Sequence, residues 1–491
     1  MGPSATLVGV SFPARLAAAC LLAGALSVLG GPAGADPQQP SARQSTDTPF
    51  STLAMRDLFV ARPTLGPFDA LLATAMLARP TDGRKDPGGD GYRGPSRKAC
   101  GPRICVHHAV RGTDAPPSRR WVLRTLRALG RVWDHEVGRL GYRPPPPDGR
   151  RGGDARFDVY LADLGARGLF GYCTPERRVR GERFAASSYC VLDDDFSRQQ
   201  FGAAPGDSLR VTAAHEFFHA VQFGYDFRED PWLLESTATW IEETFADKVD
   251  DNRRYLRFGT VRRPAVPLDD FSNDRYAHYG SWAWWEFLTG RYGDRIVRAV
   301  WGKADTVGRA PDLSSIDAVE AVLERRRGLR ATLTSYAVAN LSPADAYPEG
   351  RTWPSAKVSS VARMSPTRTD ETVRVRIDHL AARHVAFTPT RELRGGGWRL
   401  RVRVDAPRRR SAVRVTVVRT DGQLVRRVVR LDRGKGGATV RFDVRAVARV
   451  LVTMVNTSAR YRCDRNTMYA CGGEPLDDGA RFAVRAEVVR R

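Results

Sequence analysis

Residues 209–221 read LRVTAAHEFFHAV, and this stretch decides how the chain folds around its chemistry. Apolar residues surround two histidines that are four positions apart, which predicts a strongly apolar, buried helix. Side chains at positions i and i+4 stack on one face of a helix, so His215 and His219 are expected to lie side by side. The competing interpretation is a buried helix whose two histidines are satisfied by ordinary hydrogen bonds.

The spacing of the two histidines suits a metal ion. Both imidazoles can reach one zinc ion at about 2.0–2.1 Å from each nitrogen. Glu216 lies about 100° further around the helix, beside the open position of such an ion, where its carboxylate can take a proton from water. The pattern H-E-x-x-H therefore predicts a site for one Zn²⁺ per chain, with Glu216 as general base.

A third zinc ligand is expected on the next helix, because such sites use three protein ligands and leave the fourth position open. Asp230 and Pro231 are expected to be the N-cap and the first residue of that helix. Glu235 is the predicted ligand, and Glu242 is the alternative ligand or an outer partner of the site. A solvated acidic helix face is the competing interpretation for Glu235. The predicted core face consists of Leu234, Ala238, Ile241 and Phe245.

At this point the sequence resembles a family. H-E-x-x-H followed by a glutamate on the next helix is the gluzincin arrangement of zinc peptidases. Residues 215–225 and 232–243 are similar to a group of secreted bacterial metalloproteases that carry a C-terminal β-rich domain. The resemblance implies a zincin-like fold, with Glu216 as general base and with His215, His219 and Glu235 as zinc ligands. The G-A-M-E-N segment of gluzincin aminopeptidases is missing, which favours an endopeptidase.

Peptide hydrolysis also requires a donor that stabilises the oxyanion. Gluzincins often supply a tyrosine, and Tyr279 is the first candidate here, before Tyr276 and His278. An ordinary core aromatic is an equally good interpretation of Tyr279. The predicted strand Ser188–Leu192 is a candidate edge for binding an extended peptide.

Three consecutive carboxylates, Asp193, Asp194 and Asp195, follow that strand. Ca²⁺ is a candidate ligand for them, since calcium prefers oxygen donors. No other feature of the sequence supports calcium, and an exposed acidic loop is the expected structure.

The N-terminus and the cysteines predict a secreted protein. Residues 1–35 hold one charged side chain, Arg15, followed by an apolar run and a small-residue triplet, the order of a secretory signal peptide. No later stretch is apolar and long enough to predict a transmembrane segment. Outside the signal peptide the cysteines form three close couples, as expected for disulfides in an oxidising exterior: Cys100–Cys105, Cys173–Cys190 and Cys463–Cys471.

Length and pattern predict an α+β chain with several domains. The chain has 491 residues, of which 42% are hydrophobic and 27% charged, a globular composition. Residues 36–99 are expected to form a linker and an N-terminal helical segment, a candidate pro-region. Residues 100–360 are predicted as a zincin-like catalytic domain. Short alternating strands after residue 365 predict a basic β-sandwich domain over 365–491.

The net charge of +23 does not belong to the predicted site. Residues 361–491 hold 30 basic and 13 acidic side chains, whereas residues 211–250 hold nine acidic and two basic ones. Of the 78 basic residues, 72 are arginine, which resembles a coding bias, and aromatic-interleaved basic motifs are absent, so nucleic acid is an unlikely partner. The leading hypothesis is a secreted zinc endopeptidase acting on proteins or peptides. The alternative is a secreted protein whose β-domain attaches to an anionic cell-wall polymer, with a structural or inactive metal site.

Overall fold

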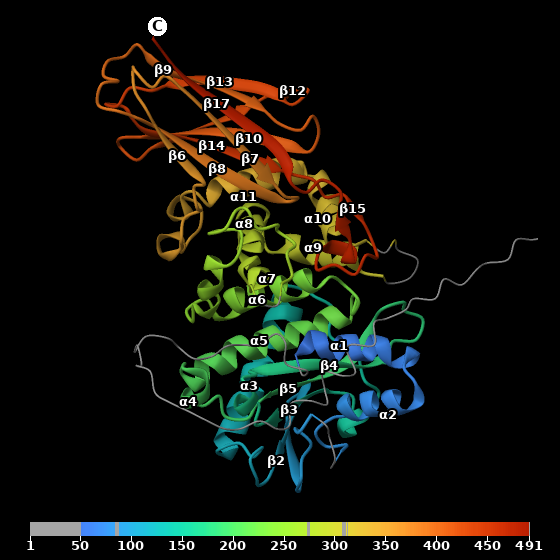
Figure 1. The fold of residues 1–491 in the computed structure, drawn as a ribbon. Helices are drawn as coiled ribbons and strands as arrows, with labels where there is room; N and C mark the ends of the chain where they lie inside the picture. Colours follow the sequence, from blue (N-terminus) through green and yellow to red (C-terminus); the bar gives the residue numbers. More distant parts are fainter. Residues whose placement is uncertain (1–50, 84–87, 273–274, 307–310, 312, 491) are drawn as a thin grey trace, which may run out of the picture. The chain divides into compact units, whose positions relative to one another are not determined.

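The computed structural model describes residues 51–83, 88–272, 275–306, 311 and 313–490 (Figure 1). The architecture is α+β, as predicted, with helices around one sheet followed by a β-rich region that is orange and red in Figure 1. The predicted signal peptide, residues 1–35, lies outside the described residues. In the described part of the chain, no helix is long and apolar enough to span a membrane.

The first sheet has five strands in the order β1-β2-β3-β5-β4. Strands β2, β3 and β5 run parallel, and β1 and β4 pair antiparallel at the two edges. The prediction that Ser188–Leu192 forms an edge is wrong, because β5 lies between β3 and β4. The edge is β4, which contains Pro175, and proline is tolerated in edge strands since it donates no ladder hydrogen bond. The strands are β1 (Ser96–Cys100), β2 (Ile104–Ala109), β3 (Phe157–Ala162), β4 (Gly171–Arg178) and β5 (Ala186–Asp193).

Two helices carry the predicted chemistry. The H-E-x-x-H motif lies on α5 (Pro205–Phe223), which packs against β4, β5, α3 (Arg119–Trp133) and α6 (Pro231–Ala246). Residues 232–243 of α6 are all buried, so this helix has no solvent-facing stripe. The interpretation of Glu235 as part of a solvated acidic face is therefore wrong, because neighbouring elements cover every side of α6. The other helices are α4 (Arg198–Phe201), α7 (Ala277–Gly280), α8 (Trp282–Tyr292), α9 (Arg295–Ala304), α10 (Ser315–Glu324) and α11 (Gly328–Ala339).

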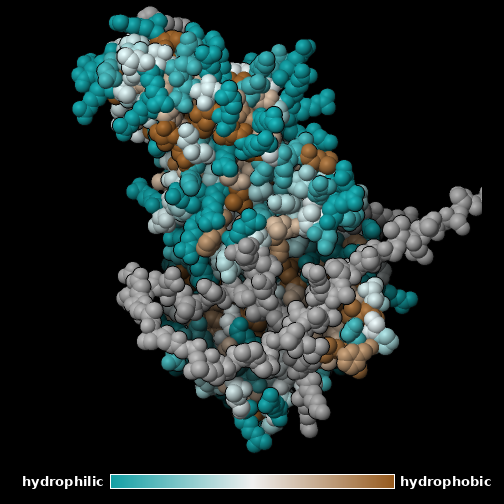
Figure 2. All heavy atoms as spheres, viewed as in Figure 1, coloured by the Kyte–Doolittle hydropathy of each residue, from teal (hydrophilic) through white to brown (hydrophobic). Residues whose placement is uncertain are grey.

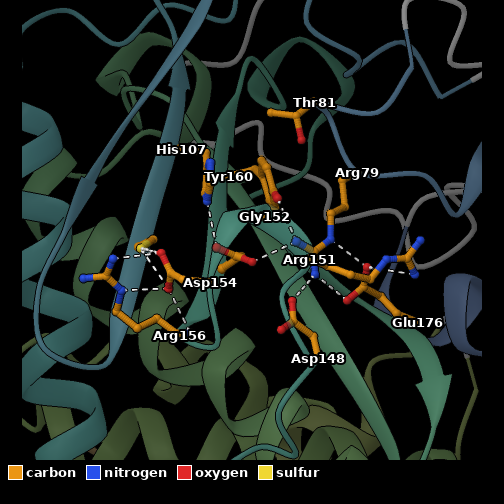
Figure 3. A network of polar contacts seen from close by, with 12 residues as sticks. Arg79, Thr81, His107, Asp148, Arg151, Gly152, Asp154, Arg156, Tyr160 and Glu176 are labelled. Atoms are coloured by element: carbon orange, nitrogen blue, oxygen red, sulfur yellow. Dashed lines mark hydrogen bonds and ion pairs between the residues drawn. The ribbon is translucent and has the colours of Figure 1, made fainter.

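The N-terminal helical segment consists of α1 (Thr52–Ala61) and α2 (Pro67–Met76), and the chain after it is tied to the sheet through Arg79. Arg79 is 2% exposed and pairs with three carboxylates, Asp148 at 2.6 Å, Asp158 at 2.8 Å and Glu176 at 2.6 Å (Figure 3). Buried carboxylates need such compensation, because an unpaired charge in the interior is strongly destabilising. Arg79 is thus an integral part of the folded region. Removal of a pro-region from residues 36–99 stays a prediction.

The β-rich region contains two five-stranded sheets, in the orders β11-β10-β14-β8-β6 and β12-β13-β9-β17-β7, and a two-stranded sheet of β15 and β16. Inward residues of both large sheets share one core, which makes this region a β-sandwich. The strands are β6 (Ser360–Met364), β7 (Asp370–Ile377), β8 (Ala381–Pro389), β9 (Trp398–Asp405), β10 (Ser411–Arg419), β11 (Leu424–Val429), β12 (Leu431–Asp432), β13 (Lys435–Arg441), β14 (Val447–Asn456), β15 (Tyr461–Arg462), β16 (Glu474–Pro475) and β17 (Ala480–Arg490).

The basic side chains of this region lie at the outward-facing positions of its strands. In β17 the exposed Arg481 and Arg485 alternate with the buried Phe482, Val484 and Ala486. On the face drawn in Figure 2 the region is largely hydrophilic, with apolar groups scattered among polar ones. The charge therefore follows from strand alternation. An anionic cell-wall polymer as its partner stays a prediction.

The three predicted disulfides are confirmed. Cys100–Cys105 links β1 to β2, Cys173–Cys190 links the edge strand β4 to β5, and Cys463–Cys471 closes a loop after β15. The last loop reaches α6, because the Cys471 backbone N–H donates to the Asp230 carboxylate at 2.8 Å. Asp230 does precede α6 as predicted, but its side chain does not cap that helix. It binds Cys471 and Ser315 instead.

Candidate metal centre

Three side-chain donors converge where α5 and α6 face each other. The Nε2 atom of His215 lies 3.3 Å from one carboxylate oxygen of Glu235, and the Nε2 atom of His219 lies 3.8 Å from the other. Donors that share a tetrahedral zinc ion with bonds of about 2.0–2.1 Å are about 3.3 Å apart. These three side chains therefore fit a zinc ion in both donor type and spacing.

The other ring nitrogen of each histidine is held by an outer partner. His215 Nδ1 lies 2.6 Å from Glu242 Oε1, and His219 Nδ1 lies 2.7 Å from Gln222 Oε1. The Gln222 amide nitrogen donates to the Leu234 carbonyl at 2.9 Å, which directs the amide oxygen toward His219. In the form that binds metal both Nδ1 atoms carry the proton, so the Nε2 atoms, which face Glu235, are the donors left for the ion. Metal-binding histidines characteristically have such partners.

Glu216 lies beside these donors and contacts the N-terminus of α1. The Thr52 hydroxyl donates to Glu216 Oε2 at 2.9 Å and accepts from the Cys173 backbone N–H on β4, also at 2.9 Å. Gly171, also on β4, passes so close that a Cβ atom there would lie 2.9 Å from Glu216 Cγ. Glycine at this position lets the edge strand approach the carboxylate.

The donors line a pocket that is open to solvent. Tyr279 lines it, with its ring 6.3 Å from that of His215 and stacked at 4.9 Å on Tyr255 from η5 (Asp251–Arg257). Tyr276 and His278, the other oxyanion candidates, are not among the lining residues. The pocket is lined by Ser51, Thr52, Leu169, Phe170, Gly171, Val211, Thr212, His215, Glu216, His219, Glu235, Glu242, Asp251, Arg254, Tyr255 and Tyr279.

Burial and mutual charge set the protonation of the site. Burial lowers the pKa of His219 to about 4, so its ring is neutral at pH 7. Burial alone would raise the pKa of Glu235, but the charges of His219 and His215 outweigh it and lower this pKa to about 2. Burial alone would lower the pKa of His215, but Glu235 and Glu242 outweigh it and raise this pKa well above its usual value. Metal binds a neutral imidazole and an ionised carboxylate, so His215 has to release a proton when the metal binds. Burial raises the pKa of Glu216 to about 7.

The sequence does not predict that four further residues belong to this site: Thr52, Gln222, Arg254 and Tyr255. Gln222 had a usable signal, because it lies three positions after His219 and shares its helix face. Thr52 and Tyr255 had none, since they reach the pocket from segments far away in the chain.

Comparison with known proteins does not assign the chain to a family. No protein-family model matches, and no curated protein matches. Solved structures match only in part. The pre-peptidase C-terminal domain of a collagenase from Bacillus anthracis is 6% identical and covers 26% of this chain and 94% of its own, with a TM-score of 0.16.

Two further solved structures show the same weak similarity. CorA, a surface-associated copper-binding protein from Methylomicrobium album BG8, is 9% identical, covers 27% of this chain and 98% of its own, and has a TM-score of 0.16. A family GH115 4-O-methyl-α-glucuronidase is 10% identical, covers 58% of this chain and 38% of its own, and has a TM-score of 0.15. These scores are too low to establish a shared fold.

Proposed function

We propose that this chain is a secreted zinc endopeptidase of the gluzincin type. One observation carries the proposal: His215, His219 and Glu235 converge on one pocket with zinc-like spacing, with both Nδ1 atoms held by outer partners. Glu216 stands in the same pocket, and a purely structural metal site would not need this carboxylate. The alternative of an inactive site is therefore less well supported.

The proposed chemistry uses the carboxylate of Glu216 twice. Zinc, when bound, acts as a Lewis acid that activates water and polarises the scissile carbonyl. Glu216 takes the proton from the attacking water at its carboxylate and then gives it to the leaving amine. In the metal-free site burial raises the pKa of Glu216 to about 7, which favours proton uptake, and the charge of a bound cation would lower this pKa again.

Substrate binding is proposed at the pocket wall where Gly171 of the edge strand β4 lies beside α5. Pairing of an extended peptide with β4 by β-augmentation would require displacement of α1, because α1 packs against this strand and Thr52 accepts the Cys173 backbone N–H. Tyr279 is the proposed donor to the oxyanion, because it lines the pocket next to His215. Glu242 is proposed to orient His215 through Nδ1 and not to bind the metal itself.

The test measures zinc content and proteolysis on the full secreted chain. The wild type is expected to hold one zinc ion and to cleave an unfolded protein such as reduced casein. Glu216→Gln is expected to keep the zinc ion but to lose about 10²–10⁴-fold in kcat/KM. The matched control is Glu324→Gln, at an exposed position of α10, which is expected to leave both readings unchanged.

The ligand set is tested separately. Glu235→Ala is expected to abolish stoichiometric zinc binding, because two histidines alone do not complete the site. Full activity of Glu216→Gln would overturn the proposed general base. Zinc binding by Glu235→Ala at wild-type affinity would overturn the ligand assignment and leave Glu242 as the candidate ligand.

A further inference from the structure

A second group of carboxylates lies where two neighbouring parallel strands end. Asp163 directly follows β3, Asp193 is the last residue of β5, and Asp194 comes next. One carboxylate oxygen from each lies within 4.8 Å of the other two. Asp193 is 0% exposed and Asp194 is 6% exposed, so the expectation of an exposed acidic loop is wrong for both residues. Parallel strands bring them together because their carboxyl ends meet at one edge of the sheet.

Two of these carboxylates have donors of their own. Asp193 accepts the backbone N–H groups of Leu164 at 3.0 Å and Gly165 at 2.7 Å on Oδ2, and those of Asp195 at 3.2 Å and Phe196 at 2.6 Å on Oδ1, so both of its oxygens are already satisfied. Asp163 accepts from the side chain of Gln200 at 3.3 Å. Asp193 therefore joins the chain after β3 to the chain after β5.

Asp194 differs from both, because no described residue donates a hydrogen bond to its carboxylate, although the side chain is more than nine-tenths buried and points toward Asp163 and Asp193. A buried, unpaired carboxylate beside two others is costly, because both desolvation and like-charge repulsion disfavour it.

The surroundings of Asp194 increase its negative potential. Burial, followed by the charges of Asp193, Asp195, Asp163 and Asp114, raises the pKa of Asp194 to about 8. Arg167 attracts Asp114, at the margin of the group. A cation at this oxygen-rich site would offset the burial and repulsion that disfavour the ionised form of Asp194.

We propose that Asp163 and Asp194 bind a calcium ion, with Asp193 holding the two strand ends in place beside it. All the donors are oxygens, which selects a hard cation over zinc or copper. The carboxylates come from two strand ends and form no regular octahedral set, and calcium accepts irregular coordination where magnesium demands an octahedron. A cation bound there would compensate the charge of the Asp194 carboxylate, which would then not need to be protonated.

The position of this site connects it to the pocket. The segment from Leu164 to Gly171 begins at Asp163 and ends in the pocket wall, where Leu169, Phe170 and Gly171 line the cavity. The Phe170 carbonyl also accepts the Asp193 backbone N–H at 3.0 Å. Calcium is expected to hold this wall in place. This consequence for catalysis rests on the proposed function, but calcium binding itself does not.

The test uses calcium alone as the probe, on the full zinc-containing chain purified without added calcium. Titration calorimetry is expected to show one Ca²⁺ per chain with a dissociation constant of roughly 10⁻⁴–10⁻³ M, as in other extracellular modules. Addition of about 10 mM Ca²⁺ is expected to raise the midpoint of thermal unfolding by about 1–3 °C. Absence of binding in the wild type would overturn the proposal, as would an equal rise with Mg²⁺.

The variants separate this site from other acidic groups. Asp194→Asn and Asp163→Asn are each expected to lose the calcium-dependent rise, and Asp194→Asn should be more stable than the wild type without calcium. Glu243→Gln is the matched control, because Glu243 belongs to a different carboxylate group with Asp247 and Glu349. A full calcium response in Asp194→Asn, or its loss in Glu243→Gln, would overturn the assignment. These readings need no peptidase activity, so they stand apart from the test of Glu216.

Discussion

His379 is expected to make the stability of this protein depend on pH. It lies between β7 and β8, is fully buried, and has a carboxylate at each ring nitrogen. Nε2 is 3.0 Å from Asp269 Oδ1, and Nδ1 is 2.6 Å from Asp478 Oδ1. With an acceptor on both sides, the ring is held as an imidazolium. Burial alone would lower the pKa of His379, but the two carboxylates outweigh it and raise the pKa to about 9.

The direction and size of the effect follow from this pKa. Because the folded value lies above the unfolded value of about 6.5, the stabilisation is fully present below pH 6.5 and is lost as the pH rises through about 9. A difference of about 2.5 pKa units corresponds to about 3 kcal/mol between pH 6 and pH 9.5. Carboxylates with raised pKa values, such as Glu243, lose stability over the same range, so the share of His379 has to be measured as a difference between variants.

The assay is urea unfolding of the wild type and of His379→Gln at about pH 6 and about pH 9.5. The variant should lack about 3 kcal/mol of the alkaline loss that the wild type shows. His384→Gln is the control, because burial lowers the pKa of His384 to about 3 and its ring stays neutral at both pH values. The reasoning is refuted if His379→Gln loses as much free energy of unfolding as the wild type does.

Three further changes test other parts of the structure. Arg79→Met removes the cation that three buried carboxylates share and is expected to cost about 3–5 kcal/mol in urea unfolding, whereas Arg103→Met breaks only an exposed pair and should cost less than about 1 kcal/mol. Equal losses would contradict the role of the network. Glu242→Gln is expected to weaken zinc binding about 10–100-fold in a chelator competition, and unchanged affinity would speak against its role at His215. The double substitution Cys463→Ser and Cys471→Ser is expected to lower the free energy of unfolding by about 2–3 kcal/mol in thermal unfolding, because the unfolded chain gains the entropy of this short loop. An unchanged midpoint would show that the loop is held by its other contacts.

The candidate metal ligands on α5 could be recognised in the sequence because their geometry is local. His215 and His219 share one helix face whatever the rest of the chain does, since the α-helix repeats every 3.6 residues. The disulfides were predictable for a similar reason: each couple is close in sequence, with separations of 5, 17 and 8 residues. Glu235 followed from the position of Asp230 and Pro231 at the start of α6.

The wrong predictions concern what lies next to a given element. The alternating pattern of Ser188–Leu192 identified β5 but not the strands next to it. The strand β4 was not predicted, because Pro175 interrupts its β-strand pattern. The polar residues of α6 suggested a face in contact with solvent, yet its polar and its apolar side chains are both buried over residues 232–243. Local pattern does not reveal which segments cover a helix from the outside.

The sequence by itself determined the pair of histidines, the glutamate between them, the helix that follows and the pairing of six cysteines. Each of these depends on a few neighbouring residues and on helix or loop geometry. Only the tertiary structure decided that Glu242 faces Nδ1 of His215, that Thr52 contacts Glu216, and that Asp194 is buried with no hydrogen-bond donor among the described residues. These contacts join segments that are far apart in the chain, and the packing that places them depends on all the residues between them.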